Sequence, residues 1–189
     1  MNQVLVTYFG AFNHFQENPT ELIANKLQRI FQSNSCIHFK KLEVSFDSID
    51  QFLASRLDEY DSIIELGVAT KSEKIRLEEF GTNFIEGTDV NGIQKNGLID
   101  ISGSETKRST FNSFDLIEWS SDFLPNVILS QSAGKYLCNY LYYKSLDRFS
   151  NKKILFIHLA NFIDLSAAIS LDTQVEIVQS FIEKSCYNT

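Results

Sequence analysis

The stretch NVILSQSAGKYLCNYLYYKSL, residues 126–146, passes from a strand-like segment through a Ser-Ala-Gly turn into a helix-like segment. Residues 126–131 are mostly apolar and include β-branched side chains, which is typical of a buried strand. The helix-like run that follows carries Cys138 in its opening turn. Because a strand that leads directly into a helix is the repeating unit of α/β proteins, this stretch predicts that class of fold.

The same alternation of strands and helices runs along most of the 189-residue chain. It predicts further strands at residues 2–9, 37–44, 61–67 and 152–159, and helices at residues 18–31, 48–57, 113–123 and 172–185. Such alternation implies a mainly parallel or mixed sheet with helices on both faces. No internal repeat or interdomain linker interrupts the pattern, which predicts one α/β domain over residues 1–189.

Local signals refine this outline. Asn18, Pro19 and Glu21 form a cap, a first-turn proline and a capping-box-like spacing at the start of the first helix. Asp172 is a plausible cap for the last helix. From about residue 70 to 108 the chain is richer in glycine and does not follow the strand-helix pattern, which predicts a meander or hairpin excursion.

Composition and charge narrow the function. The chain has 17 basic and 24 acidic residues, for a net charge of −7, which argues against a nucleic-acid partner. No apolar run approaches the roughly 18 residues that a membrane span needs, and the N-terminus does not read as a secretory signal. Three widely spaced cysteines without a CxxC pair indicate free thiols. We therefore expect a cytoplasmic protein with no membrane partner.

Cys138 has two interpretations. At a helix start, unpaired amides and the helix dipole favour a thiolate and can hold an oxyanion, so Cys138 is a candidate nucleophile. Against this, most free cysteines are buried and pack as small hydrophobes. His158, near the end of a predicted strand, is a candidate base, and Glu78 a candidate orienting carboxylate. Both residue types are also common at structural positions, so the residue inventory alone leaves the choice open.

Motifs for cofactors and metals are missing from the sequence. It contains no GxGxxG, Walker A, HExxH or GxSxG pattern, and His14 and His38 have no partner at metal-ligand spacing. We therefore expect neither a cofactor nor a metal.

Several segments, taken in order, resemble the pyroglutamyl peptidase I (pyrrolidone-carboxylate peptidase) family of cysteine peptidases. SAGKYLCN resembles the family's SAGTFVCN nucleophile motif, and FIHLA its FIHVP histidine motif. The full set is VLVTYFGAF (4–12), ELGVA (65–69), LEEFGTN (77–83), SAGKYLCN (132–139), FIHLA (156–160) and ISLD (169–172). The likeness thus extends from near the first residue to the final helix.

The resemblance implies a three-layer α/β/α sandwich of the phosphorylase/hydrolase-like type with a mixed, mainly parallel sheet. It also implies a thiol exopeptidase that removes an N-terminal pyroglutamyl group from peptides through a thioester, without metal or cofactor. In that scheme Cys138 is the nucleophile, His158 the general base and acid, and Glu78 the residue that orients His158. The residues implied at the substrate pocket are Phe9, Phe12, Tyr136 and Leu137. The implied partner is a small peptide with a blocked N-terminus, and family members are often homo-oligomers.

The chain also departs from the family pattern. Tyr8 replaces a glycine and is expected to crowd the pocket, and Glu79 replaces an arginine and adds a charge near the proposed triad. TKS (70–72) replaces GGR, and IEGTDVNG (85–92) lacks an expected active-site arginine. Two alternatives therefore stay open: an amidase for another small cyclic amide, and a catalytically weakened or inactive member that acts as a binding protein.

Overall fold

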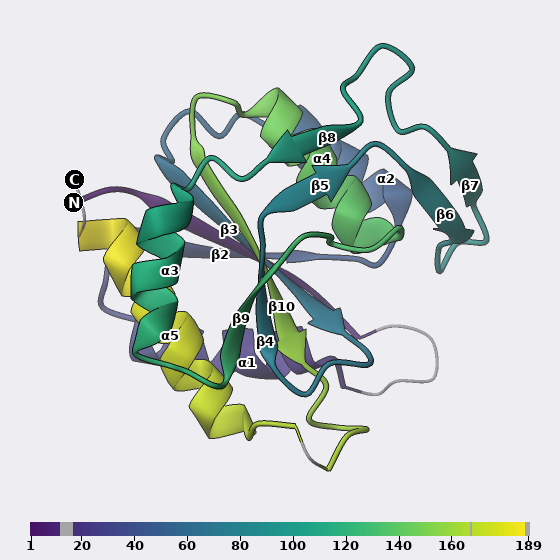
Figure 1. The fold of residues 1–189 in the computed structure, drawn as a ribbon. Helices are drawn as coiled ribbons and strands as arrows, with labels where there is room; N and C mark the ends of the chain where they lie inside the picture. Colours follow the sequence, from purple (N-terminus) through teal and green to yellow (C-terminus); the bar gives the residue numbers. More distant parts are fainter. Residues whose placement is uncertain (12–16, 167, 188–189) are drawn as a thin grey trace.

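The computed structural model describes residues 1–11, 17–166 and 168–187, and Figure 1 shows its fold. Six strands form the central sheet in the order β2-β1-β3-β10-β4-β9. All neighbouring pairs are parallel except β10 and β4, which run antiparallel. The strands are β1 (Val4–Phe9), β2 (Ile37–Leu42), β3 (Ser62–Ala69), β4 (Ile75–Glu78), β9 (Val127–Ser130) and β10 (Lys153–Ala160). The prediction of a mixed, mainly parallel sheet is confirmed.

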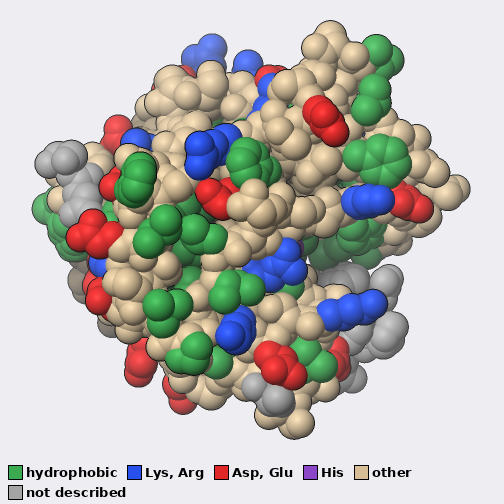
Figure 2. All heavy atoms as spheres, viewed as in Figure 1, with side chains coloured by type: hydrophobic (Ala, Val, Ile, Leu, Met, Phe, Trp, Pro, Cys, Tyr) green, Lys and Arg blue, Asp and Glu red, His purple; other side chains and the backbone are tan. Residues whose placement is uncertain are grey.

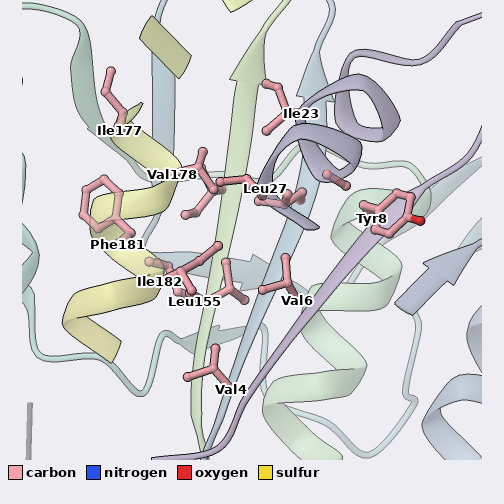
Figure 3. Close-up of a cluster of buried hydrophobic side chains, with 14 of the residues drawn as sticks. Val4, Val6, Tyr8, Ile23, Leu27, Leu155, Ile177, Val178, Phe181 and Ile182 are labelled. Atoms are coloured by element: carbon pink, nitrogen blue, oxygen red, sulfur yellow. The ribbon is translucent and has the colours of Figure 1, made fainter. Parts of the chain in front are cut away.

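Helices cover both faces of this sheet. The helices are α1 (Pro19–Ile30), α2 (Phe46–Ala54), α3 (Ser113–Ser121), α4 (Leu137–Arg148) and α5 (Leu171–Tyr187). One buried cluster joins α1, α3 and α5 to the sheet, and a second joins α2 and α4 to the opposite face. Figure 3 shows the first cluster, in which side chains of α1 and α5 meet those of β1 and β10. The three-layer α/β/α sandwich is therefore confirmed.

Residues 70–108 differ in part from the expected meander. Their first strand, β4, enters the central sheet instead of staying outside it. The rest forms two small antiparallel sheets, in which β5 (Phe80–Thr82) pairs with β8 (Thr106–Arg108), and β6 (Ile85–Thr88) pairs with β7 (Gln94–Gly97). In Figure 1 these lie on the side of α4 and α2, with the β6–β7 hairpin projecting outward.

The caps of two helices test the local predictions. Asn18 caps α1 as expected, because its side chain accepts the amide of Thr20. The capping-box role of Glu21 is wrong, since its carboxylate accepts the amide of Ala11 and pairs with Lys41.

At the start of α5 the cap is Ser170 and not Asp172. The Ser170 hydroxyl accepts the amide of Thr173 at 3.2 Å, whereas Asp172 lies inside the first turn and pairs with Lys26. Among the described residues, no helix has the length and apolar character needed to cross a membrane.

Candidate active site

Three of the predicted site residues meet on one face of the sheet. His158 lies near the end of β10, Glu78 ends β4, and Cys138 is the second residue of α4. The Nδ1 atom of His158 lies 2.7 Å from Oε1 of Glu78. The Cys138 side chain is the other group that raises the pKa of this ring, and Nε2 is the nitrogen left for it. Thiol, imidazole and carboxylate thus form one series, with His158 between the other two.

The antiparallel pairing of β4 with β10 brings Glu78 to His158. In this register Arg76 lies opposite His158, and Glu78 lies opposite Phe156. Arg76 and Glu78 are two residues apart on one strand, so their side chains share a face. The Arg76 Nε atom lies 3.1 Å from Glu78 Oε1, but the two are not aligned as a hydrogen bond. Arg76 is therefore an ion-pair partner of Glu78, which the sequence reasoning missed although the spacing indicated it.

Arg76 also connects Glu78 to the loop that precedes Cys138. Its Nη2 atom donates to the hydroxyl of Ser130 and to the carbonyl of Ser132, the latter at 3.0 Å. Because Ser132 begins the SAGK turn, the arginine links the Glu78 carboxylate to the loop that leads into α4 and Cys138.

The charge state of His158 follows from its burial and its two partners. Burial lowers the pKa of this imidazole, but hydrogen bonds with Cys138 and Glu78 outweigh it and raise the pKa to about 9. The ring is therefore protonated at neutral pH in the free protein. A protonated imidazole beside a thiol is the setting that favours a thiolate.

Cys138 lies in a close-packed corner next to a glycine of β3. A Cβ atom at Gly67 would lie 2.8 Å from the Cys138 sulfur and 2.7 Å from the ring of Phe156. No side chain can therefore occupy position 67 while Cys138 keeps its place. In the sequence Gly67 stands out only as part of the ELGVA segment, and nothing there indicates this contact.

The start of α4 leaves backbone amides free near the thiol. Tyr136 occupies the N-cap position, and its side chain makes no capping hydrogen bond. The first amides of a helix have no partner within the helix, so those next to Cys138 are available to a ligand. Gly134, with φ of +84°, makes the left-handed turn that leads into this helix.

Tyr136 connects the loop before α4 to the β6–β7 hairpin. Its hydroxyl donates to the carbonyl of Thr88 at 2.7 Å, and its ring covers Gly87, where a Cβ would approach it to 2.5 Å. The amide of Glu86 also donates to the carbonyl of Lys135 at 2.7 Å. The Tyr136 ring thus packs on the hairpin segment that lacks the expected arginine.

The other predicted pocket residues are placed as follows. Phe9 and Leu137 are buried in the same cluster, on the α2–α4 side of the sheet. Phe12 lies outside the described residues. Tyr136 packs against that cluster and lies closest to solvent of the three described residues. Phe9, Tyr136 and Leu137 therefore share the face of the sheet on which Cys138 lies.

Two of the expected perturbations are wrong. Tyr8 does not crowd this face, because its ring packs in the opposite cluster (Figure 3). Its hydroxyl accepts a hydrogen bond from Gln28 of α1. Glu79 does not add an unpaired charge beside His158. Its carboxylate accepts hydrogen bonds from Gln131, Arg108 and Ser113.

A second buried carboxyl lies behind the site on β3. Glu65 is fully buried, and its Oε1 atom accepts the hydroxyl of Ser145 at 2.6 Å. Its Oε2 atom and the hydroxyl of Thr7, its register partner on β1, have no hydrogen-bond partner among the described residues. Burial raises the pKa of Glu65 to about 8, against the smaller lowering by Ser145. Glu65 is therefore largely uncharged at neutral pH.

A cleft opens beside Cys138 and His158, and we call it the active-site cleft. Its volume is about 550 Å³, and it is lined by Val68, Ala69, Thr70, Lys71, Ser72, Arg76, Ile128, Ser132, Ala133, Gly134, Lys135, Tyr136, Cys138 and His158. Within the part of the chain that the structure describes, no cluster of three or more His, Cys, Asp or Glu side chains could hold a metal ion. The remaining cysteines, Cys36 and Cys186, are free and buried away from the cleft.

A thiol beside an imidazole, which a buried carboxylate contacts in turn, is the arrangement of cysteine hydrolases. The comparison with known families agrees with this class. The model of the pyroglutamyl peptidase family matches residues 2–184, so the chain belongs to that family.

The relatives are named as pyrrolidone-carboxylate peptidases. A pyrrolidone-carboxylate peptidase from Thermococcus litoralis is 30% identical over 151 residues, which cover 77% of this chain and 69% of that protein. Another from Saccharolobus islandicus is 27% identical over 194 aligned positions and covers 95% and 93% of the two chains. A mutant pyrrolidone carboxyl peptidase from Pyrococcus furiosus has a similar structure, with a TM-score of 0.85, 27% identity and coverage of 98% and 99%.

Proposed function

We propose that this protein is a cysteine exopeptidase that removes an N-terminal pyroglutamyl residue from peptides. The observation that carries the proposal is the series formed by Cys138, His158 and Glu78, in a chain that belongs to the pyroglutamyl peptidase family. Each member of the series has a distinct role.

In the first step the Cys138 thiolate attacks the carbonyl carbon of the pyroglutamyl amide. The carbonyl oxygen becomes an oxyanion, which the free amides at the start of α4 can stabilise. As the tetrahedral intermediate collapses, His158 gives its Nε2 proton to the leaving amine. The C–N bond breaks, the shortened peptide leaves, and a thioester remains on Cys138.

In the second step water hydrolyses the thioester. His158, now neutral, takes a proton from the water as it attacks the thioester carbon. The S–C bond breaks, pyroglutamate leaves, and the thiolate and imidazolium are restored. Glu78 keeps Nδ1 of His158 protonated and fixes the ring, and Arg76 holds the Glu78 carboxylate in turn.

Phe9, Phe12, Tyr136 and Leu137 are the proposed contacts of the lactam ring. The positions of the three described residues support this, because they lie on the same face of the sheet as Cys138. A flat neutral lactam suits apolar walls, with backbone groups left to recognise its N–H and C=O.

The test is release of a fluorophore from a pyroglutamyl-linked reporter. We expect the native protein to release it, Cys138→Ala to release it only at the uncatalysed rate, and Cys36→Ala, a matched change at a buried thiol, to keep activity. Equal rates for the native protein and Cys138→Ala would refute the proposal. Glu78→Ala should retain the fold by circular dichroism and lose most of the activity.

We further propose that the protein is cytoplasmic and forms a homo-oligomer. Free thiols suit a reducing compartment. Figure 2 shows apolar side chains grouped over α3 and β9. Phe114 and Ile117 of α3 are 80% and 52% exposed. Exposed apolar groups of this kind favour assembly. Light scattering coupled to size exclusion measures the mass, and a mass of one chain at all concentrations would refute the oligomer.

A further inference from the structure

The active-site cleft extends from Cys138 in one direction along the sheet. Its lining residues come from the end of β3 and the segment after it, from β10, β4 and β9, and from the start of α4 and the loop before it. Phe9 lies on β1, which the strand order places on the other side of β3 from β10, β4 and β9. The cleft therefore leads away from Phe9, the proposed wall of the lactam site.

The proton transfer fixes which part of a substrate lies in this cleft. His158 must be next to the leaving amine to protonate it, and His158 lines the cleft. The leaving amine belongs to the second residue of the substrate, so that residue occupies the cleft while the lactam lies toward Phe9.

The charged side chains that line the cleft, apart from those of the triad, are all basic. Lys71, Arg76 and Lys135 line it, and no Asp or Glu does so within the described ranges. Arg76 is engaged by Glu78, but neither Lys71 nor Lys135 makes an ion pair with a described residue. The Lys135 Nζ atom lies 5.3 Å from the centre of the Phe84 ring, a contact that leaves its charge without an acidic partner. Both lysines are exposed. Figure 2 shows basic side chains on this face, over the ends of β4 and β10. The chain as a whole has a net charge of −7, so the excess of basic side chains is a local feature of this cleft.

Acidic side chains lie beyond the cleft and limit the part of the surface that favours a negative charge. Glu17 and Asp164 line a neighbouring hollow that shares Val68 and Thr70 with the cleft. Asp164 accepts a hydrogen bond from Asn161 there. A negative charge is therefore favoured only where the second residue lies, and not farther along this surface.

We propose that Lys71 and Lys135 select pyroglutamyl peptides whose second residue carries a carboxylate. That carboxylate is either the side chain of Asp or Glu or the C-terminal carboxylate of a dipeptide. The inference rests on the proposed function, because it assigns a substrate class to the same site. Lys71 lies in the TKS segment, where the chain departs from the family's GGR.

The test compares kcat/KM for four small substrates at low and high salt. They are pyroglutamyl-glutamic acid amide, pyroglutamyl-alanine with a free carboxylate, pyroglutamyl-alanine amide and pyroglutamyl-lysine amide. Exposed ion pairs contribute about twofold to fivefold each. We expect both anionic substrates to exceed the neutral amide by about that factor or more, and the lysine amide to be the slowest. Salt should reduce the differences, because the lysines are exposed.

Variants assign the effect to the two lysines. Lys71→Met and Lys135→Met should each reduce the preference for the anionic substrates by about twofold to fivefold, with little change for the neutral amide. Lys74→Met is the matched control, since Lys74 is exposed nearby but does not line the cleft, and it should change nothing. Preference for only one anionic substrate would identify the source of the carboxylate.

Two failures are distinguishable. If the neutral amide is cleaved and Cys138→Ala abolishes cleavage, but the four substrates react equally, the selection by lysine is refuted and the proposed function stands. If no substrate is cleaved faster than by Cys138→Ala, the proposed function itself is refuted, and the inference with it.

Discussion

Replacing Glu65 with glutamine tests whether the carboxyl buried behind the active site is uncharged in the folded protein. Glutamine keeps the size of the side chain and an oxygen that can accept from Ser145, but it has no proton to lose. Because burial raises the pKa of Glu65 from 4.5 to about 8 in the folded chain, the native protein carries a proton there that the unfolded chain has already lost.

The direction in which the free energy of unfolding changes with pH follows from this difference in pKa between the folded and unfolded states. Below pH 4.5 both states hold the proton, so Glu65 contributes its full stabilisation there. As the pH rises toward 8 the unfolded chain loses its proton first, and the free energy of unfolding falls. Each pKa unit corresponds to 1.36 kcal/mol, so the rise from 4.5 to about 8 amounts to roughly 5 kcal/mol in total. About 3 kcal/mol of this is lost between pH 5.5 and 8.5.

The assay is urea unfolding followed by the fluorescence of Trp119, which packs against Phe111 and Phe181. The free energy of unfolding of Glu65→Gln minus that of the native protein should rise by about 3 kcal/mol from pH 5.5 to 8.5. Since His158 titrates in both proteins, its contribution cancels. Glu118→Gln, an exposed matched change, should show no such trend. A difference that stays constant with pH would refute the reasoning.

Three further predictions concern the site and its supports. Glu78→Gln should lower kcat by about 10² to 10⁴ and move the alkaline limb of the pH profile to lower pH, because Glu78 helps to raise the pKa of His158; an unmoved limb would count against this role. Gly67→Ala should lose activity and about 1–3 kcal/mol of unfolding free energy in urea, since the added Cβ has no room. Ser170→Ala should lower the free energy of unfolding by about 1 kcal/mol in the same assay, and Asp172→Ala should lower it by only a few tenths. The reverse order would show that Asp172 is the cap.

Much of the fold could be predicted because its signals are local. Apolar periodicity and the cap at Asn18 placed the five helices and most strands of the central sheet close to their observed positions. The strand at Ile75–Glu78 is different, since nothing in four residues states that they join β10 in antiparallel pairing. Such a choice depends on contacts with distant strands, which a local pattern does not contain.

The two wrong predictions about the site, for Tyr8 and for Glu79, have one physical origin. Successive side chains on a strand point to opposite faces. Tyr8 and Phe9 therefore cannot both line one pocket, and Glu78 and Glu79 cannot both face His158. Applied to the sequence, the same rule also places Arg76 beside Glu78. The contact of Gly67 with Cys138 could not be predicted in this way, because it depends on how α4 approaches the sheet.

Because two of the three thiols are buried, a thiol titration can count the molecules whose active site is accessible. Cys36 and Cys186 are 8% and 0% exposed, and burial raises the pKa of the Cys186 thiol, so neither reacts readily in the folded chain. A thiol reagent should therefore modify one equivalent, at Cys138, before denaturation and three afterwards. Three times the ratio of the first titre to the second gives the fraction of a preparation with an open active site, and rates can be stated per competent molecule.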